Sequence, residues 1–263
     1  MSFFQSIILG IIQGLTEFLP VSSSGHLALA QALFEDFEQP GLLYDTLLHL
    51  ATLLAVGVFF RRRIMRLIKA FFGLFFIKYR LIYHEERGML WGIIAATVPT
   101  GIIGYLLRDL SESVFDKPII VGYCLILTSV MLMLADKAAK GGPVTPRKAI
   151  IVGIAQGLAV FPGISRSGTT IFAGMMAGIS REKAAEFSFL ISIPAIIGAM
   201  ILQLKHFSEV TSADITVYLA GMGAAFFFGI LAIGVMMEIV KKAKMRYFAL
   251  YCLILGICVV VFL

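Results

Sequence analysis

Four side chains that could act together on an anionic substrate stand inside two apolar segments of this chain. Glu17, Ser23 and His26 belong to the first segment, and Arg166 belongs to the second. A carboxylate or an imidazole can accept a proton from a hydroxyl or a water, and a serine hydroxyl is itself a nucleophile. A guanidinium binds phosphate through two parallel hydrogen bonds. We interpret these four residues as the candidate catalytic set.

The two segments are copies of one unit. Residues 10–25 read GIIQGLTEFLPVSSSG and residues 153–168 read GIAQGLAVFPGISRSG, which match at nine of sixteen positions without a gap. The substitutions carry the chemistry, because Val160 stands opposite Glu17, Arg166 opposite Ser23 and Thr169 opposite His26. Repeated membrane proteins often bring such copies together at a pseudo-two-fold axis. The copies are therefore expected to form one composite site.

Composition places the chain in a membrane. Hydrophobic residues make up 59% of the chain, charged residues 14%, and the mean hydropathy is +0.95. This exceeds what a soluble core could bury, so we expect one all-α integral membrane domain over residues 1–263, with lipid rather than nucleic acid as its partner. Six windows are long enough to cross a hydrocarbon core of about 30 Å. They are residues 42–60, 89–107, 119–135, 187–204, 215–237 and 247–263.

Charge predicts the orientation. Eighteen of the 22 Lys and Arg fall in residues 61–87, 137–148, 181–183 and 241–246, whereas residues 35–38 are acidic. Because short basic loops stay cytoplasmic, the four basic regions are expected inside and residues 35–38 outside. The first spanning helix then runs from outside to inside and the fourth from inside to outside, so the repeat is inverted. The first repeat would cover residues 1–135 and the second residues 149–263. Residues 6–34 and 149–179 are too short to span twice, so we predict two re-entrant helix–loop–helix segments whose breaks line a cavity near the midplane.

The polar residues of the breaks have structural as well as functional interpretations. An intramembrane carboxylate such as Glu17 is costly, which favours function, whereas Gln13 has a twin in Gln156 and is interpreted as a packing amide. Ser22 and Ser24 also have serine twins and suit backbone bracing. His26 could be a proton acceptor or a satisfied core histidine.

Arg166 is the clearest indication of an anion site. A guanidinium inside a membrane segment needs an anionic partner. Four neighbouring hydroxyls could bind a phosphate together with it: Ser165, Ser167, Thr169 and Thr170. The helix that follows offers free N–H groups to the same anion. The alternative is an internal salt bridge between Arg166 and Glu17. The two interpretations are compatible, because the salt bridge can form while the site is empty.

The motifs resemble those of a known family. The segments QGLTEFLPVSSSGH (residues 13–26), PGISRSGTT (residues 162–170) and REKAAEFSFLISIP (residues 181–194) are similar to the undecaprenyl-diphosphatase family of bacterial inner membranes, the bacitracin-resistance type. The resemblance covers nearly the whole chain. The positions that match the family's functional motifs are Glu17, Ser23, His26, Ser165, Arg166 and Thr170.

The resemblance implies an enzyme that hydrolyses undecaprenyl diphosphate to the monophosphate and inorganic phosphate, which recycles the carrier lipid for cell-wall synthesis. It also implies dependence on a divalent cation, Mg²⁺ or Ca²⁺, and a site open to the periplasm. Many members have two acids in an E-x-x-x-E motif, whereas this chain has Gln13 at the first position. Glu17 would then be the only acidic metal ligand, with substrate phosphates completing the shell.

A transporter or flippase of a phosphorylated lipid or organic anion is the alternative, because inverted repeats with broken helices are also the plan of secondary transporters. A lipid phosphatase with an S-R-x₆-H motif is excluded, since the first histidine after Arg166 is His206. The sequence leaves open a covalent phosphoserine or direct water attack, the metal, the isoprenoid length, flipping of the product and assembly as a homodimer.

Overall fold

The computed structural model describes residues 1–263 apart from 35–41, 77, 80–83, 136–140 and 243. The described residues are largely helical, and the β-type pairing among them is an isolated bridge between Gly142 and Ile179. The predicted all-α class is confirmed. The acidic residues 35–38 and the start of the basic 137–148 segment lie outside the described residues.

The first predicted re-entrant segment forms a helical hairpin of α1 (Phe3–Phe18) and α2 (Ser23–Ala32). Ser2 caps α1 by accepting the Gln5 N–H. Pro20 has no N–H to continue the helix, so the chain breaks at this point. Ser22 then adopts a left-handed conformation with φ of 68° and caps α2 by accepting the Gly25 N–H.

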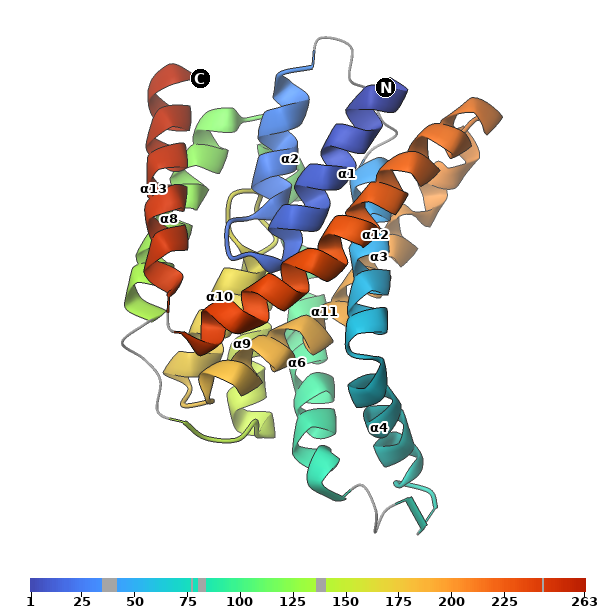
Figure 1. The fold of residues 1–263 in the computed structure, drawn as a ribbon, viewed down its shortest axis with the longest axis vertical. Coiled ribbons are helices and arrows are strands. Elements are labelled where there is room, and N and C mark those ends of the chain that lie inside the picture. Colours follow the sequence, from blue (N-terminus) through green and yellow to red (C-terminus); the bar gives the residue numbers. More distant parts are fainter. Residues whose placement is uncertain (35–41, 77, 80–83, 136–140, 243) are drawn as a thin grey trace.

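The second segment forms the equivalent hairpin of α9 (Pro146–Leu158) and α10 (Arg166–Met176). Pro146 suits the first turn of α9 because the N–H it lacks would have had no partner there. Its break contains Pro162 and Gly163, whose φ of 95° favours glycine. Ser165 caps α10 by accepting the Gly168 N–H, as Ser22 does in the first copy. The hairpins enter from opposite ends of the molecule (Figure 1).

Five described helices are long and apolar enough to cross a membrane: α6 (Arg87–Leu106), α8 (Pro118–Ala135), α11 (Arg181–Gln203), α12 (Ser212–Lys241) and α13 (Met245–Phe262). They fall on five of the six predicted windows. The sixth window forms α3 (Leu43–Phe59), which has 17 residues and turns by 83° into the basic α4 (Arg61–Phe72).

Three further helices among the described residues connect these elements. Two are short 3-10 helices, η1 (His84–Glu86) and η2 (Leu204–Glu209), and the third is α7 (Arg108–Phe115), which follows α6 after Leu107. Residues 108–115 lie between two of the predicted spanning windows. They form a short amphipathic helix in which Val114 is buried and Asp109 is exposed.

Small residues bring each hairpin against a long helix of the other half. A Cβ added at Gly10 of α1 would lie 2.1 Å from the Gly221 carbonyl oxygen of α12, and one at Gly153 of α9 would lie 2.3 Å from the Ala96 carbonyl oxygen of α6. Such contacts let helix backbones approach closely in a membrane. Gly10 and Gly153 are equivalent in the sequence repeat. This equivalence supports the division into residues 1–135 and 149–263, which stays a prediction.

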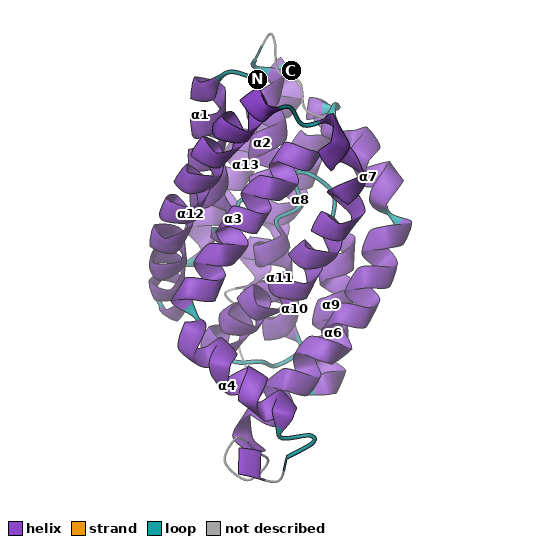
Figure 2. Ribbon diagram, turned by 90° about the vertical axis from the view of Figure 1, so that its right-hand side faces the viewer, coloured by secondary structure: helices purple, strands orange, loops and turns teal. Residues whose placement is uncertain are grey.

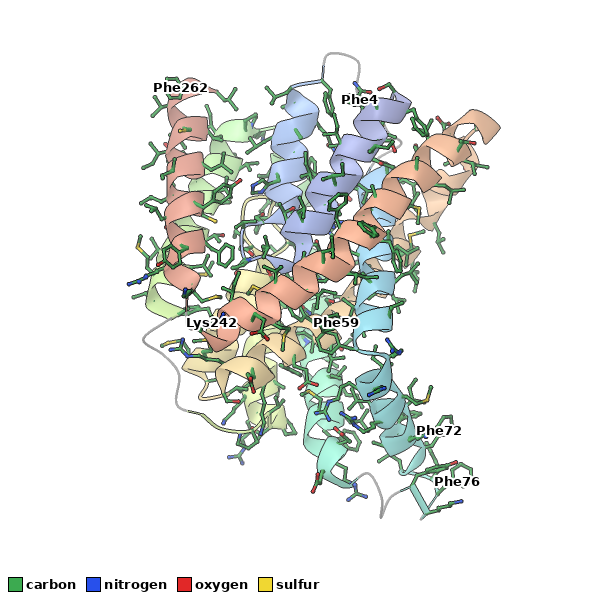
Figure 3. All side chains as sticks on the ribbon, in the orientation of Figure 1. Phe4, Phe59, Phe72, Phe76, Lys242 and Phe262 are labelled. Carbon is green, nitrogen blue, oxygen red and sulfur yellow. The ribbon has the colours of Figure 1, made fainter. Side chains whose placement is uncertain are left out.

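Apolar side chains cover the outside of the helical bundle (Figure 3). Phe4, Phe76 and Phe262 are 72%, 57% and 81% exposed. An apolar exterior over many helices would be a liability in water and is expected against lipid. The fold is therefore that of a multi-pass membrane protein.

The two ends of the bundle are expected to face opposite sides of the membrane. α7 lies toward the end that holds both termini (Figure 2), and α9 begins at the other end (Figure 1). Asp116, which follows α7, and Arg147, in the first turn of α9, are both exposed. In a chain with Cys124, Cys252 and Cys258 replaced by alanine, Asp116→Cys should react with an impermeant thiol reagent on intact cells. Arg147→Cys should react only after permeabilisation, because a basic loop is expected on the cytoplasmic side. Reaction of both from one side would contradict this topology.

Candidate active site

The two breaks meet inside the molecule. Gly163 N–H of the second break donates to Ser22 Oγ of the first at 3.0 Å, and Ser167 Oγ donates to the Leu19 carbonyl oxygen at 3.1 Å. The contact is close, since a Cβ added at Gly25 would lie 2.8 Å from the Gly163 nitrogen. Residues far apart in the chain therefore share one small volume.

Glu17 is the centre of this volume. One carboxylate oxygen, Oε1, accepts a hydrogen bond from the Arg166 guanidinium of the second copy. The other, Oε2, accepts from Ser23 Oγ at 2.6 Å and from Gln13 Nε2 at 2.8 Å. The Glu17 side chain is 1% exposed, whereas that of Arg166 is 22% exposed. The carboxylate is thus fully enclosed, while the guanidinium keeps a face toward open space.

Gln13 and Gln156 differ in what they hold, although they are sequence twins. Gln156 Nε2 donates to Thr100 Oγ1 at 3.2 Å and to the Ile191 carbonyl oxygen at 3.3 Å, which braces α9 against α6 and α11. This fits the packing role predicted for both amides. Gln13 instead contacts Glu17 directly, so it belongs to the site.

The hydroxyls predicted to bind phosphate divide into two groups. Ser165 and Ser167 line the cavity beside Arg166. Thr170 Oγ1 bonds to the Arg166 carbonyl oxygen at 2.8 Å and to Ser188 Oγ at 2.6 Å, while Thr169 Oγ1 lies 3.9 Å from the Met131 sulfur. The structure does not place the two threonines on the cavity wall, so a phosphate role for them stays a prediction.

His26 faces away from the other candidate residues. Its Nδ1 lies 2.8 Å from the Ser22 carbonyl oxygen, and its Nε2 lies 2.7 Å from the Tyr251 hydroxyl of α13. The imidazole also stacks on the Tyr251 ring, with centroids 5.7 Å apart. The structure does not bring His26 to Ser23 Oγ, whose observed acceptor is Glu17. Proton transfer by His26 stays a prediction of the sequence.

A different histidine, His49 of α3, lies at the centre. Its Nε2 is 3.4 Å from Glu17 Oε2, and its Nδ1 donates to the Asp45 carbonyl oxygen at 2.8 Å. Gln31 of α2 in turn donates to Asp45 Oδ1 at 2.6 Å. Sequence reasoning missed His49 and Asp45 because the window 42–60 was read only as a spanning helix. Two ionisable residues inside that window were the available signal.

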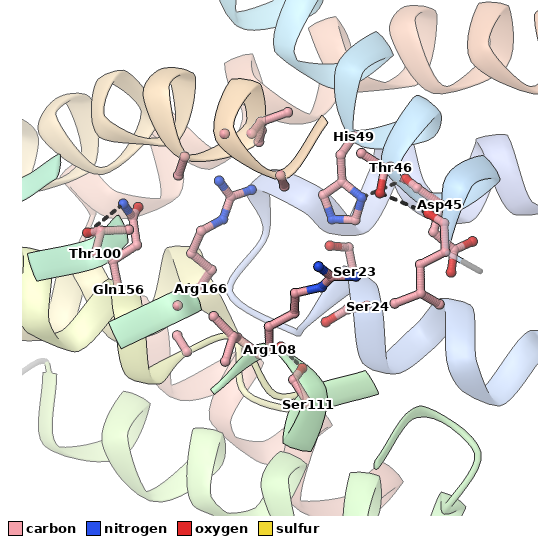
Figure 4. A pocket seen from close by; sticks show the side chains of 18 of the residues that line it. Ser23, Ser24, Asp45, Thr46, His49, Thr100, Arg108, Ser111, Gln156 and Arg166 are labelled. Atoms are coloured by element: carbon pink, nitrogen blue, oxygen red, sulfur yellow. Dashed lines mark hydrogen bonds between the residues drawn. The ribbon is translucent and has the colours of Figure 1, made fainter. Parts of the chain in front are cut away.

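These groups open onto one cavity of about 480 Å³. Ser23 and Ser24 of α2, His49 of α3 and Arg166 of α10 lie around it (Figure 4). Its wall is partly apolar, with Pro194, Ala195, Ala199 and Leu202 contributed by α11. A polar centre with an apolar wall suits a molecule that joins an anionic group to a hydrocarbon.

Oxygen ligands for a divalent cation exist here only in part. Within the described residues, no three His, Cys, Asp or Glu side chains group as a metal site. Glu17 is the central acid, and the buried Gln13 Oε1 beside it has no hydrogen-bond partner in the described part of the chain. A carboxylate and an amide oxygen are ligands that Mg²⁺ and Ca²⁺ accept, but they do not form a complete shell.

The fold and the buried cluster define an all-α membrane protein that holds reactive polar groups where two broken helices meet. The chain belongs to a known family of such proteins, because the family model described as bacitracin resistance protein BacA matches residues 6–258. A relative from Methanosphaera stadtmanae is 43% identical over 98% of this chain and 96% of its own length. One from Syntrophotalea carbinolica is 42% identical over 97% of both chains. Both relatives are named undecaprenyl-diphosphatase.

Removing only one partner of the Glu17–Arg166 pair should lower the free energy of unfolding. Removing one member of a buried ion pair leaves the other charge uncompensated, which typically destabilises by about 3–5 kcal/mol. Arg166→Ala should therefore lower the free energy of unfolding in detergent by about that amount. The double variant Arg166→Ala/Glu17→Gln should recover most of the loss. If the double variant unfolds as readily as Arg166→Ala alone, the pair does not carry the charge balance of the cavity.

Proposed function

We propose that this protein hydrolyses undecaprenyl diphosphate to undecaprenyl phosphate and inorganic phosphate, which returns the carrier lipid to cell-wall synthesis. Membership of the family and the names of relatives above 40% identity support this activity. The observation that carries it is the contact of Glu17 with both Ser23 and Arg166 at the cavity. Nucleophile, proton acceptor and anion-binding group are thereby assembled from both copies.

In the proposed reaction, the terminal phosphoryl group approaches Arg166, which exchanges part of its interaction with Glu17 for the phosphate. The guanidinium balances charge on the phosphoryl oxygens, which otherwise repel a nucleophile. Ser165 and Ser167 lie beside Arg166, and their hydroxyls donate to the same oxygens once they give up their present acceptors. The hydrocarbon chain leaves the cavity along the apolar wall of α11.

Attack then occurs at the terminal phosphorus. The oxygen of Ser23, or of a water in its place, forms a bond to phosphorus while the bond to the bridging oxygen breaks. The nucleophile's proton passes to Glu17 Oε2, which already accepts from Ser23 Oγ at 2.6 Å. The lipid monophosphate leaves with the bridging oxygen. The serine route requires a second step, in which water cleaves the phosphoserine; direct water attack does not.

The proposal includes three expectations from the family resemblance. The membrane is the bacterial inner membrane, the site opens to the periplasm, and a divalent cation assists. The cation would be held by Glu17 and the Gln13 Oε1 and would neutralise phosphate charge. The transporter alternative uses the same paired broken helices, and it differs in needing two compartments and no bond cleavage.

Phosphate release by the purified protein in detergent tests the proposed hydrolysis without any compartments. The wild-type protein should release inorganic phosphate from undecaprenyl diphosphate. Arg166→Ala should lose at least about 10²- to 10³-fold in rate, as is typical when a preorganised charge stabiliser is removed. Arg166→Lys should recover only part of this, since the lysine lacks the planar fork. A folded Arg166→Ala protein with near wild-type turnover would move the transporter reading ahead.

Cation dependence should follow Glu17. EDTA should abolish phosphate release, and added Mg²⁺ or Ca²⁺ should restore it. Glu17→Gln should lose both activity and the response to either ion, because the carboxylate proposed to hold the ion is gone. Gln13→Glu is the matched variant and should retain activity, since it replaces an amide oxygen with a carboxylate oxygen at the neighbouring position. A Glu17→Gln protein that stays active and metal-responsive would contradict this assignment.

A further inference from the structure

A second arginine reaches the cavity from outside the repeated motifs. Arg108 is the first residue of α7 and lines the same cavity as Ser23, Ser24 and Arg166 (Figure 4). Among the described lining residues, Arg108 and Arg166 are the two Lys or Arg side chains. The mechanism above uses only Arg166.

The short helix α7, which carries Arg108, packs directly against the active site. Ser111 Oγ of α7 donates to the Val160 carbonyl oxygen of the second break at 2.8 Å. Val114 of α7 is buried, and Phe115 contributes to the cavity wall. The position of Arg108 is therefore set relative to the break that supplies Arg166.

The side chain of Arg108 is oriented by a carboxylate that leaves its outer donors available. Arg108 Nε donates to Glu112 Oε1 at 2.8 Å. Its terminal nitrogens, Nη1 and Nη2, have no hydrogen-bond partner among the described residues. The hydrogen bond to Glu112 raises the pKa of Arg108 above its ordinary value, so the group stays charged. Arg108 thus presents a cation with free N–H groups to the cavity.

A diphosphate needs more positive charge than Arg166 supplies. Arg166 shares its charge with Glu17, and the terminal phosphoryl group must lie beside Arg166 and Ser23 to be attacked. The other phosphoryl group, which carries the lipid, remains between the terminal group and the hydrocarbon. Its charge grows as the bridging oxygen leaves, so a cation near it stabilises the departing group.

We propose that Arg108 binds the lipid-linked phosphoryl group of the diphosphate and retains that group in the lipid monophosphate product. The two arginines would divide the diphosphate, with Arg166 on the phosphate that is released and Arg108 on the one that stays with the lipid. This inference rests on the proposed function. Its alternative is that Arg108 forms only a local helix ion pair with Glu112.

The two products separate these possibilities, because only the lipid monophosphate contains the phosphoryl group assigned to Arg108. A short-chain prenyl monophosphate and inorganic phosphate are titrated as inhibitors of wild-type, Arg108→Ala and Arg108→Lys proteins. Lys117→Ala is the matched control, since it removes an exposed cation close by that does not line the cavity. Unfolding in detergent shows whether each variant is folded.

Arg108→Ala should weaken inhibition by the prenyl monophosphate about 10- to 150-fold, the equivalent of one charge-assisted hydrogen bond. Inhibition by inorganic phosphate should change less than about twofold by the same scale. Arg108→Lys should fall between wild type and Arg108→Ala. Lys117→Ala should change neither inhibitor.

Three outcomes would overturn the inference. One is unchanged prenyl monophosphate affinity in Arg108→Ala, and another is equal weakening of both inhibitors, which would indicate a general field effect. The third is a Glu112→Gln variant that loses the same affinity as Arg108→Ala, which would assign the effect to the ion pair. Equilibrium binding of the prenyl monophosphate to the same variants needs no turnover. It therefore tests Arg108 even if the wild-type protein releases no phosphate and the proposed hydrolysis fails.

Discussion

The pairing of Glu17 with Arg166 is the interaction on which the site depends. Each charge stands in an apolar segment where it could not remain alone, and each comes from a different copy of the repeat. Burial of one charge is acceptable only because the other balances it. The pair therefore joins the two breaks electrostatically and holds the guanidinium beside the cavity.

This pairing is possible because the backbone of the two breaks is non-helical. The breaks lack regular hydrogen bonds, and their polar groups are satisfied by one another, as in the contacts of Gly163 N–H with Ser22 Oγ and of Ser167 Oγ with the Leu19 carbonyl oxygen. Irregular backbone is tolerated in a membrane only where protein or a cavity covers it. The close contacts of Gly10 with α12 and of Gly153 with α6 allow these two long helices to pack tightly against the hairpins that contain the breaks.

The sequence predicted those parts of this arrangement that depend on residue types unusual in a membrane segment. Breaks marked by proline, glycine and serine, a lone acid and a lone arginine in apolar sequence were sufficient to predict two hairpins that meet. Side-chain direction was not predictable. His26 follows Ser23 by three residues on α2, yet its ring contacts Tyr251 of α13 and not Ser23. His49 and Arg108 reach the cavity through the packing of α3 and α7, which no local pattern encodes.

The left-handed residue of each break shows how far the two copies have diverged. In the first copy Ser22 has φ of 68°, whereas in the second Gly163 has φ of 95° and Ser165 is extended. Ser22 combines two tasks, since its hydroxyl accepts both the Gly25 and the Gly163 N–H groups. Because Pro20 occupies the place equivalent to Gly163 and has no N–H, the reciprocal bond cannot form. The contact between the two breaks therefore runs in one direction: the first break supplies the hydroxyl acceptor and the second supplies the N–H donor. Two breaks of the first kind could not form this contact, because each would have proline at the donor position.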